Sequence, residues 1–209
     1  DRTRQIQVGG KPLNGSEGSP AYATTDVSGT VTVEENFSED DAWNIKWDGS
    51  TLTLNGATIT AGSSNGAAIY RRGELTITLT GSNTVKGPEA ADSIGIRIAN
   101  GNLTIGGGGS LDVSGRIDYL DIDATSLNIG IYVDGEYDIT INNCTIEAEG
   151  SGVVSGSSYG IFSEFGDVII NGGTVTARGG AVQNSDSMSY GIRASEVSIT
   201  NRGKVKAYG

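Results

Sequence analysis

The amino-acid sequence predicts an all-β protein that folds as a right-handed, single-stranded parallel β-helix. Three observations lead to this prediction. Glycine is frequent, at 33 of 209 residues, and it accompanies alternating Ile, Val, Leu and Thr residues, which is typical of short strands joined by turns. The apolar spacing of three and four residues that marks helices is nearly missing. The alternating segments also recur in groups of three, and repetition at roughly 20–50 residues is typical of a solenoid.

About six turns of the solenoid, called rungs here, are predicted, each made of three short strands. An isoleucine anchors the first strand of each rung, and the anchors are Ile45, Ile69, Ile96, Ile131, Ile161 and Ile192. They are separated by 24, 27, 35, 30 and 31 residues. Each strand has one apolar and one polar face, so a rung can bury its inner face only by stacking on the next rung. Gly and Asn-Gly steps supply the bends between strands, where positive φ is needed.

The chain is expected to form one structural domain in two parts. Residues 1–40 are predicted to cap the first rung, with strands near 6–8 and 30–33, and residues 41–209 to form the β-helix. A cap is needed because the open end of a solenoid exposes its core and its strand edges. No cap is visible after the last predicted strand, so further domains of the same protein are expected to follow.

Composition excludes several classes of function. Without histidine the chain has no Ser-His-Asp triad and no His-ligated zinc site, and its one cysteine cannot close an internal disulfide. A net charge of −11 argues against a nucleic-acid partner, which requires Lys and Arg against phosphate. No apolar run approaches the roughly 18 residues of a membrane helix, so no membrane insertion is expected. Cys144 is predicted to fill a small-residue position of the core, aligned with Ala57, Gly173 and Gly203.

Residues that follow the anchors are expected to point outward and to form a ladder along the solenoid. This predicted column consists of Lys46, Tyr70, Arg97, Tyr132, Phe162 and Arg193. Neighbouring rungs stand about 4.8 Å apart, so the rings and guanidinium groups of the column could stack on the sugar rings of an extended polysaccharide. The alternative is a ladder of aromatic and cation–π contacts that only stiffens the sheet. A slip of one residue in any rung would turn its side chain inward.

A second outward column is predicted to carry mostly hydroxyl side chains. Its members are Thr53, Thr76, Thr104, Asp138 and Ser198, interrupted by Ile169. Threonine on an exposed strand is usually explained by its β propensity, so we interpret this column mainly as structural, with ligand binding as the alternative.

Two acidic clusters are candidates for metal binding or for catalysis. The first comprises Glu34, Glu35, Glu39, Asp40 and Asp41, and the second comprises Asp118, Asp121 and Asp123 in the longest connector. Calcium takes six to eight oxygen ligands, so the second cluster is a candidate calcium site, although it matches no EF-hand loop. A solvated loop is the alternative for both clusters. Paired carboxylates also leave open a pectin-type hydrolase, or a lyase with Arg97 or Arg193 as its base.

The pattern of the rungs resembles a known family. It is carried by Gly-Ile steps, by Asn-Leu-Thr-Ile and Gly-Gly-Thr-Val, and by the segment Trp47-Asp48-Gly49-Ser50-Thr51-Leu52-Thr53-Leu54-Asn55-Gly56-Ala57-Thr58-Ile59. Over roughly residues 41–209 the chain is similar to bacterial surface proteins with parallel β-helix repeats, often described as carbohydrate-binding-domain-containing, from Gram-positive bacteria. The resemblance implies export, surface display and polysaccharide binding, in some members with bound calcium.

Together these observations favour a secreted or cell-surface, non-catalytic module of a bacterium that binds polysaccharide along the outward column and requires no cofactor. Two alternatives stay open: a structural stalk or adhesin segment without a ligand, and a pectin-type lyase or hydrolase. The exposure of the outward column distinguishes the first two, because an exposed shallow groove favours binding and a covered column favours the stalk.

Overall fold

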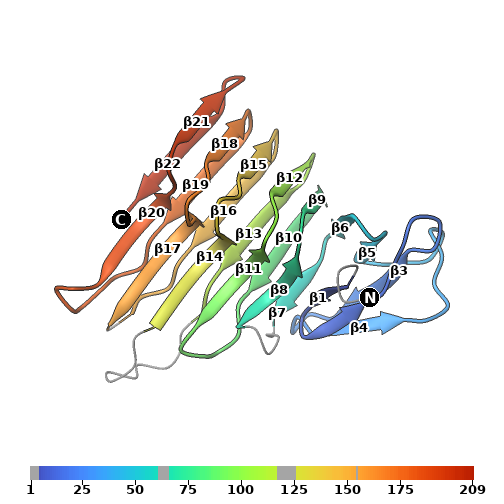
Figure 1. The fold of residues 1–209 in the computed structure, drawn as a ribbon. Coiled ribbons are helices and arrows are strands. Elements are labelled where there is room, and N and C mark those ends of the chain that lie inside the picture. The colour runs from blue at the N-terminus through green and yellow to red at the C-terminus, as the bar shows by residue number, and fades with distance from the viewer. Residues whose placement is uncertain (1–4, 61–65, 117–125, 154) are drawn as a thin grey trace.

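Three β-sheets wrap around one long core. The computed structural model describes residues 5–60, 66–116, 126–153 and 155–209. Within them every regular element is a strand. The strands form a seven-stranded, a nine-stranded and a six-stranded sheet, and from residue 51 onward consecutive strands pass from one sheet to the next. Figure 1 shows the resulting stack, with the N-terminal strands at one end and the last strands at the other. The predicted parallel β-helix is therefore confirmed.

Five complete rungs make up the stack, each with one strand in every sheet. The first is β8 (Ala67–Arg72), β9 (Leu75–Thr80) and β10 (Ser82–Lys86); the second is β11 (Ser93–Ala99), β12 (Leu103–Gly107) and β13 (Ser110–Ser114); the third is β14 (Ser126–Asp134), β15 (Ile139–Asn142) and β16 (Thr145–Glu149). The fourth is β17 (Gly156–Ser163), β18 (Val168–Asn171) and β19 (Thr174–Arg178), and the fifth is β20 (Met188–Arg193), β21 (Val197–Thr200) and β22 (Lys204–Tyr208). An incomplete rung, β6 (Thr51–Asn55) and β7 (Thr58–Thr60), precedes them.

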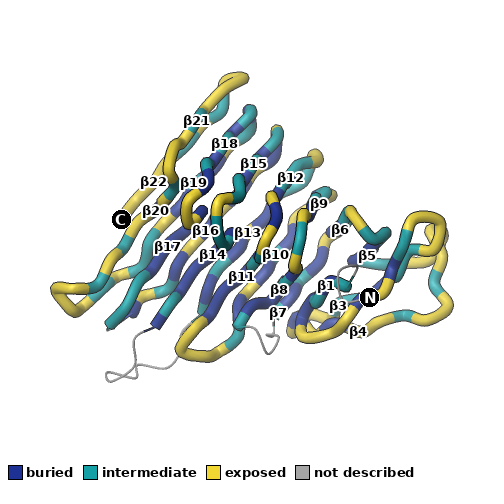
Figure 2. The backbone as a smooth tube through the Cα atoms, in the orientation of Figure 1, coloured by how far each residue is buried: buried dark blue, intermediate teal, exposed yellow. Residues whose placement is uncertain are grey.

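The core lies inside the stack because the strands pair in parallel and in register. Leu103 of β12, for example, pairs with Leu75 on one side and Ile139 on the other. Inward residues of each strand therefore meet inward residues of its neighbours, and those of the central rungs are almost fully buried (Figure 2). Short strands of this kind cannot bury a face alone, so the stacking of rungs is what stabilises each strand.

The N-terminal cap is more extensive than the sequence predicted. It comprises β1 (Ile6–Val8), β2 (Lys11–Leu13), β3 (Ala21–Thr25), β4 (Val31–Glu34) and β5 (Ile45–Trp47). All of its pairings are antiparallel: β1 lies between β2 and β8 in the seven-stranded sheet, and β5 lies between β3 and β6 in the nine-stranded sheet. The unit anchored on Ile45 is thus the last strand of the cap and not the first strand of a rung. Five complete rungs form, where six were predicted.

The last rung leaves its inward residues only partly covered. Val197 and Ile199 occupy inward positions of β21, in register with Val168 and Ile170, yet they are 43% and 49% exposed. The strands β20, β21 and β22 each have a neighbour on one side only. This end of the described chain is therefore the place where the solenoid presents apolar surface and unpaired strand edges.

Cys144 lies in the core, as predicted. It is 3% exposed and precedes β16, where it aligns with Gly173 and Gly203 through the backbone hydrogen bonds that link Thr174 to Cys144 and Lys204 to Gly173. Ala57 does not belong to this set, because the pairing of β7 with β10 places it two positions further along the strand. The turns before β7 and β16 both contain two residues, but β6 continues two positions further along its sheet than β15 does, so the whole turn is displaced.

The burial of Cys144 leads to a reactivity prediction. Burial raises the pKa of its thiol to about 11, and only the thiolate attacks a disulfide reagent. We expect the folded protein to react very slowly with an aromatic disulfide reagent at mildly alkaline pH, and the same thiol to react at once in concentrated guanidinium chloride. Free cysteine in the same buffer is the control, and rapid reaction of the folded protein would contradict the described position.

Candidate functional site

The predicted outward ladder exists over five rungs of the seven-stranded sheet. Tyr70, Arg97, Tyr132, Phe162 and Arg193 pair directly with one another from β8 to β20. We call these five residues the outer column. Lys46 is not part of it, because β5 lies in the nine-stranded sheet and the place beside β8 is taken by β1. The residue that follows the anchor was therefore placed correctly in every complete rung.

A neighbouring column, which the sequence analysis missed, completes the site. Ile94, Ile129, Tyr159 and Tyr190 also pair in register, three residues before the outer column. Together with Ala67, the first three join Tyr132 and Phe162 in an apolar cluster that is separate from the core. Simple alternation would have placed them inward, because each lies two positions before the anchoring Ile, with a single Gly between them. This Gly interrupts the alternation, and its recurrence before the anchors of the second to fifth rungs is the signal that could have revealed the column.

The aromatic rings of the two columns stack on one another. The ring centroids of Tyr132 and Phe162 lie 5.1 Å apart with planes 8° from parallel. Tyr159 contacts Phe162 at 4.6 Å and Tyr190 at 5.9 Å. Such distances are those of favourable aromatic pairs. The side chains of the site thus form a continuous strip of rings across the third, fourth and fifth rungs.

The two arginines close this strip at both ends. Arg97 lies 5.7 Å from the ring centroid of Tyr132 and donates a hydrogen bond of 2.9 Å to Asp134. Arg193 lies 5.2 Å from the ring centroid of Phe162 and donates to the hydroxyl of Tyr159 at 2.9 Å. Burial acts to lower the pKa of Arg97, but the hydrogen bonds and the charge of Asp134 raise it above its ordinary value. Both guanidinium groups make cation–π contacts with the rings of the strip.

A ligand could contact only those rings of the strip that are exposed to solvent. Tyr132 and Phe162 are only 9% and 8% exposed, and Tyr159 is 1% exposed. Burial, followed by the charges of Asp134 and Glu164, raises the pKa of Tyr132. Only at the fifth rung is a ring open, since Tyr190 is 45% exposed and Arg193 is also exposed. The centre of the outer column is therefore covered by its own neighbours.

The second predicted column lies on the nine-stranded sheet, with two corrections. The register places Thr51, and not Thr53, beside Thr76, and it places Thr140, and not Asp138, beside Thr104. Ile169 and Ser198 follow as predicted. Thr53 occupies the adjacent column, and Asp138 lies in the turn before β15. Both errors arise where the length of the turn differs from that of the neighbouring rung.

The acidic clusters contribute no metal site among the residues that the structure describes. Asp118, Asp121 and Asp123, the predicted calcium ligands, lie outside the described residues. In the first cluster Glu39 forms an ion pair with Lys46 and accepts a hydrogen bond from the Tyr22 hydroxyl at 3.1 Å. The hydrogen bond from Lys46 lowers the pKa of Glu39. Within the described ranges no group of three acidic or sulfur ligands comes together, and no helix there is long and apolar enough to cross a membrane.

Two hollows on the six-stranded sheet were not predicted. A polar cleft of about 470 Å³ runs along the ends of its strands, where Lys86, Glu149 and Arg116 line it. A smaller hollow of about 120 Å³ is lined by Asp112, Glu147 and Arg178. Asp112 and Glu147 pair on neighbouring strands, so their carboxylates share one open face. Glycoside cleavage requires two carboxyl groups across a cleft that holds the substrate, whereas these two lie side by side, and the described residues that line the hollow all belong to β13, β16 and β19.

The fold and the site define the class of this protein: a parallel β-solenoid whose outer aromatic strip is packed on itself. Comparisons with protein-family models, with curated protein sequences and with solved structures return no match to the chain.

Proposed function

We propose that this chain is a rigid, non-catalytic repeat module of an exported bacterial protein, and that it acts as a stalk or spacer at the cell surface. The observation that carries the proposal is the packing of the outer column. Its rings and guanidinium groups contact one another along the solenoid, where a ligand-binding ladder would leave them free.

The stacking geometry supports this proposal over polysaccharide binding along the same column. A ring binds sugar through its face, because the face carries the apolar and π surface. Tyr132 has Phe162 on one side and Arg97 on the other, and Phe162 lies between Tyr132 and Arg193. The faces of both rings are therefore already in contact with neighbours, and a sugar would have to displace them.

The same contacts stiffen the solenoid. They join rungs that are about 30 residues apart in the sequence, such as Tyr132 and Phe162. Each aromatic pair contributes roughly 0.5–1.5 kcal/mol and each exposed cation–π contact roughly 0.5–1 kcal/mol. Because every contact links one rung to the next, the strip increases the cost of separating neighbouring rungs, which is the property that a stalk requires.

The proposal predicts that Phe162→Ala lowers the free energy of unfolding by about 2–3 kcal/mol, because a ring that is only 8% exposed leaves a cavity and loses two aromatic neighbours. Phe165→Ala is the matched control: Phe165 is 63% exposed and its removal should change stability by less than about 0.5 kcal/mol. Urea denaturation followed by circular dichroism measures both. Affinity electrophoresis on plant, mucin and cell-wall glycans should show the same mobility for the two variants. Normal stability of Phe162→Ala combined with a loss of retention would instead assign the column to glycan binding.

A further inference from the structure

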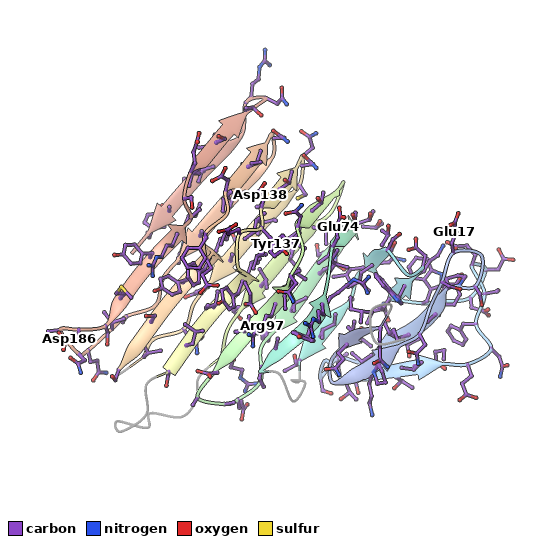
Figure 3. The ribbon with its side chains drawn as sticks, viewed as in Figure 1. Glu17, Glu74, Arg97, Tyr137, Asp138 and Asp186 are labelled. Atoms are coloured by element: carbon purple, nitrogen blue, oxygen red, sulfur yellow. The ribbon has the colours of Figure 1, made fainter. Side chains whose placement is uncertain are left out.

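The outer face of the six-stranded sheet carries charges of both signs. Its outward residues form two columns in register: the first is Thr58, Thr84, Asp112, Glu147, Thr176 and Lys206, and the second is Thr60, Lys86, Ser114, Glu149, Arg178 and Tyr208. We call these two columns the charged face. The strands β6, β9, β12, β15, β18 and β21 of the nine-stranded sheet contain no charged residue, and Glu74 and Asp138, which Figure 3 labels, lie before such strands and not on them. The charges are therefore a property of this face and not of every face of the repeat.

The charges of this face have no ionic partner within the chain. Every charged side chain of the two columns is exposed, and none takes part in an ion pair between described residues. Glu149 lies directly beside Arg178 in the register, but the guanidinium of Arg178 lies over Tyr208, 4.8 Å from the centroid of its ring. Asp112 lies directly beside Glu147, and like charges on opposed residues are destabilising. A partner of matching charge would therefore relieve an unfavourable arrangement.

Along the solenoid the charges are sorted by sign. The acidic residues Asp112, Glu147 and Glu149 lie on β13 and β16, and the basic residues Arg178 and Lys206 lie on the next two strands, β19 and β22. We call these two groups the acidic half and the basic half. Each half spans two rungs, so the two have the same width of about 10 Å. Such a face is complementary to itself when a second copy is turned end for end.

We propose that two copies of this chain associate through the charged face, related by a two-fold axis that runs parallel to the strands between β16 and β19. Such an axis keeps each column in place and reverses the order of the strands, so β13 faces β22 of the second copy and β16 faces β19. Asp112 then lies opposite Lys206 of the second copy, and Glu149 lies opposite Arg178. The symmetry forms each of these pairs twice, and the two solenoids run antiparallel.

The other orientation of the two copies is unfavourable. A two-fold axis along the solenoid would place the acidic half on the acidic half of the second copy and the basic half on the basic half. The axis parallel to the strands instead opposes carboxylates to cations, and Lys86, on β10, lies outside the four strands that meet. The charges thus select one arrangement of two identical faces, and such selection is the main contribution of electrostatic complementarity to a contact.

The contact is small, so a single pair of copies is expected to bind weakly. Four strands of about five residues cover roughly 16 by 19 Å, or about 300 Å² on each copy. Interfaces that bury less than about 1,200 Å² in total are typical of weak, transient association. Many identical contacts between two coated surfaces strengthen one another, and an antiparallel pair joins modules that project from opposite surfaces. This last step rests on the proposed stalk function, whereas the pairing of copies does not.

The experiment is an aggregation assay with beads that carry the chain attached at its N-terminus, followed by light scattering at low and high salt. Variant D112K/E149R reverses the acidic half alone, and variant D112K/E149R/R178E/K206D reverses both halves. We expect beads with the natural chain to aggregate at low salt and to separate at high salt, because exposed charges are screened. Aggregation of beads with the first variant should fall at least about tenfold, because each attraction becomes a repulsion.

Reversal of both halves should restore aggregation, because every opposed pair again has opposite signs. Beads with this variant should not join beads with the natural chain, since like charges then meet. The matched control is E35R/D40K, which makes the same two kinds of substitution at exposed residues of the cap, and its beads should aggregate as those of the natural chain do.

Four results would overturn the proposal: no aggregation of the natural chain at low salt, equal aggregation of the first variant and the control, no recovery on reversal of both halves, or mixed aggregates of natural and fully reversed beads. Aggregation that requires added calcium would overturn it too, and would assign the acidic half to the cation. Circular dichroism melting checks that the variants fold; if one unfolds, E149R and E149R/R178E repeat the comparison with E35R as the control. The Phe162 test of the stalk function measures stability and is independent of all these outcomes.

Discussion

Replacing Trp47 with Ala is expected to lower the free energy of unfolding by about 3–5 kcal/mol, the range for removing a large aromatic ring from a core. Trp47 lies on β5, where the cap meets the solenoid, and it is fully buried. It belongs to the core cluster that runs through the rungs. Its loss would therefore leave a cavity at the only boundary in the described chain where antiparallel cap and parallel rungs share a core.

The environment of Trp47 adds to this effect. The guanidinium of Arg71 lies 4.6 Å from its ring centroid, and Arg71 is only 7% exposed. Arg71 donates to the carbonyl of Glu74 at 2.8 Å, while its Nη1 has no hydrogen-bond partner among the described residues. Burial lowers the pKa of Arg71. Without the indole face this buried cation would lose its main stabilising neighbour.

Trp43→Ala provides the control, because Trp43 belongs to the same cap but is only half-buried and contacts Tyr22 and Lys46 near the surface. Urea denaturation of both variants, followed by far-ultraviolet circular dichroism, measures the difference. We expect the loss for Trp47→Ala to be at least twice that for Trp43→Ala. Equal losses would mean that Trp47 does not join the cap to the core.

Gly130→Ala is expected to cost about 3 kcal/mol, at the upper end of the range for overpacking. Gly130 belongs to β14, at the bend before the anchoring Ile131. A Cβ at this position would lie 2.6 Å from the carbonyl oxygen of Gly160 and 3.0 Å from the backbone of Glu149 and of Val113. These are backbone atoms of three other strands of the stack, β13, β16 and β17, so they cannot turn aside as a side chain would. The rungs would have to separate locally.

The control for this substitution is Gly108→Ala. A Cβ on Gly108 would meet nothing within 4 Å, and its φ is not in the left-handed region. Replacing such a glycine leaves stability unchanged or raises it by about 0.4–1 kcal/mol, because the unfolded chain loses freedom. Thermal and urea unfolding compare the two variants. A stable Gly130→Ala would show that neighbouring rungs are further apart at this bend than described.

Much of the fold could be predicted from the sequence because the side chains of a strand alternate between its two faces, and this local rule involves only neighbouring residues. The alternation of apolar and polar residues predicted which side chains face the core in the segments 103–105 and 139–141. The structure confirms this, because Leu103, Ile105, Ile139 and Ile141 are completely buried. The same rule placed Arg97, Tyr132 and Phe162 outward and in register. Because parallel stacking repeats the same pairing, one correctly read rung predicts the next.

The errors occurred where the local rule does not apply. Lys46 follows an isoleucine in the same pattern as the true anchors, but β5 pairs with β3 in antiparallel fashion, and that choice depends on how residues 5–44 fold back. Thr53 and Asp138 were misplaced because the lengths of the turns before their strands differ. Tyr159 and Tyr190 were missed because the bend at the Gly of each first strand turns the preceding residue outward.

The glycine content, the drifting period and the alternation of apolar residues therefore determine by themselves that this chain is a stack of parallel strands with a lone buried thiol. Only the tertiary structure decided whether the outer column is open to a ligand. Tyr132 touches Phe162, which lies 30 positions away in the sequence, and a local pattern does not carry the distance between rings on different rungs. The same holds for the uncharged strands β6, β9, β12, β15, β18 and β21, because their lack of charge becomes a surface property only after the fold brings them side by side.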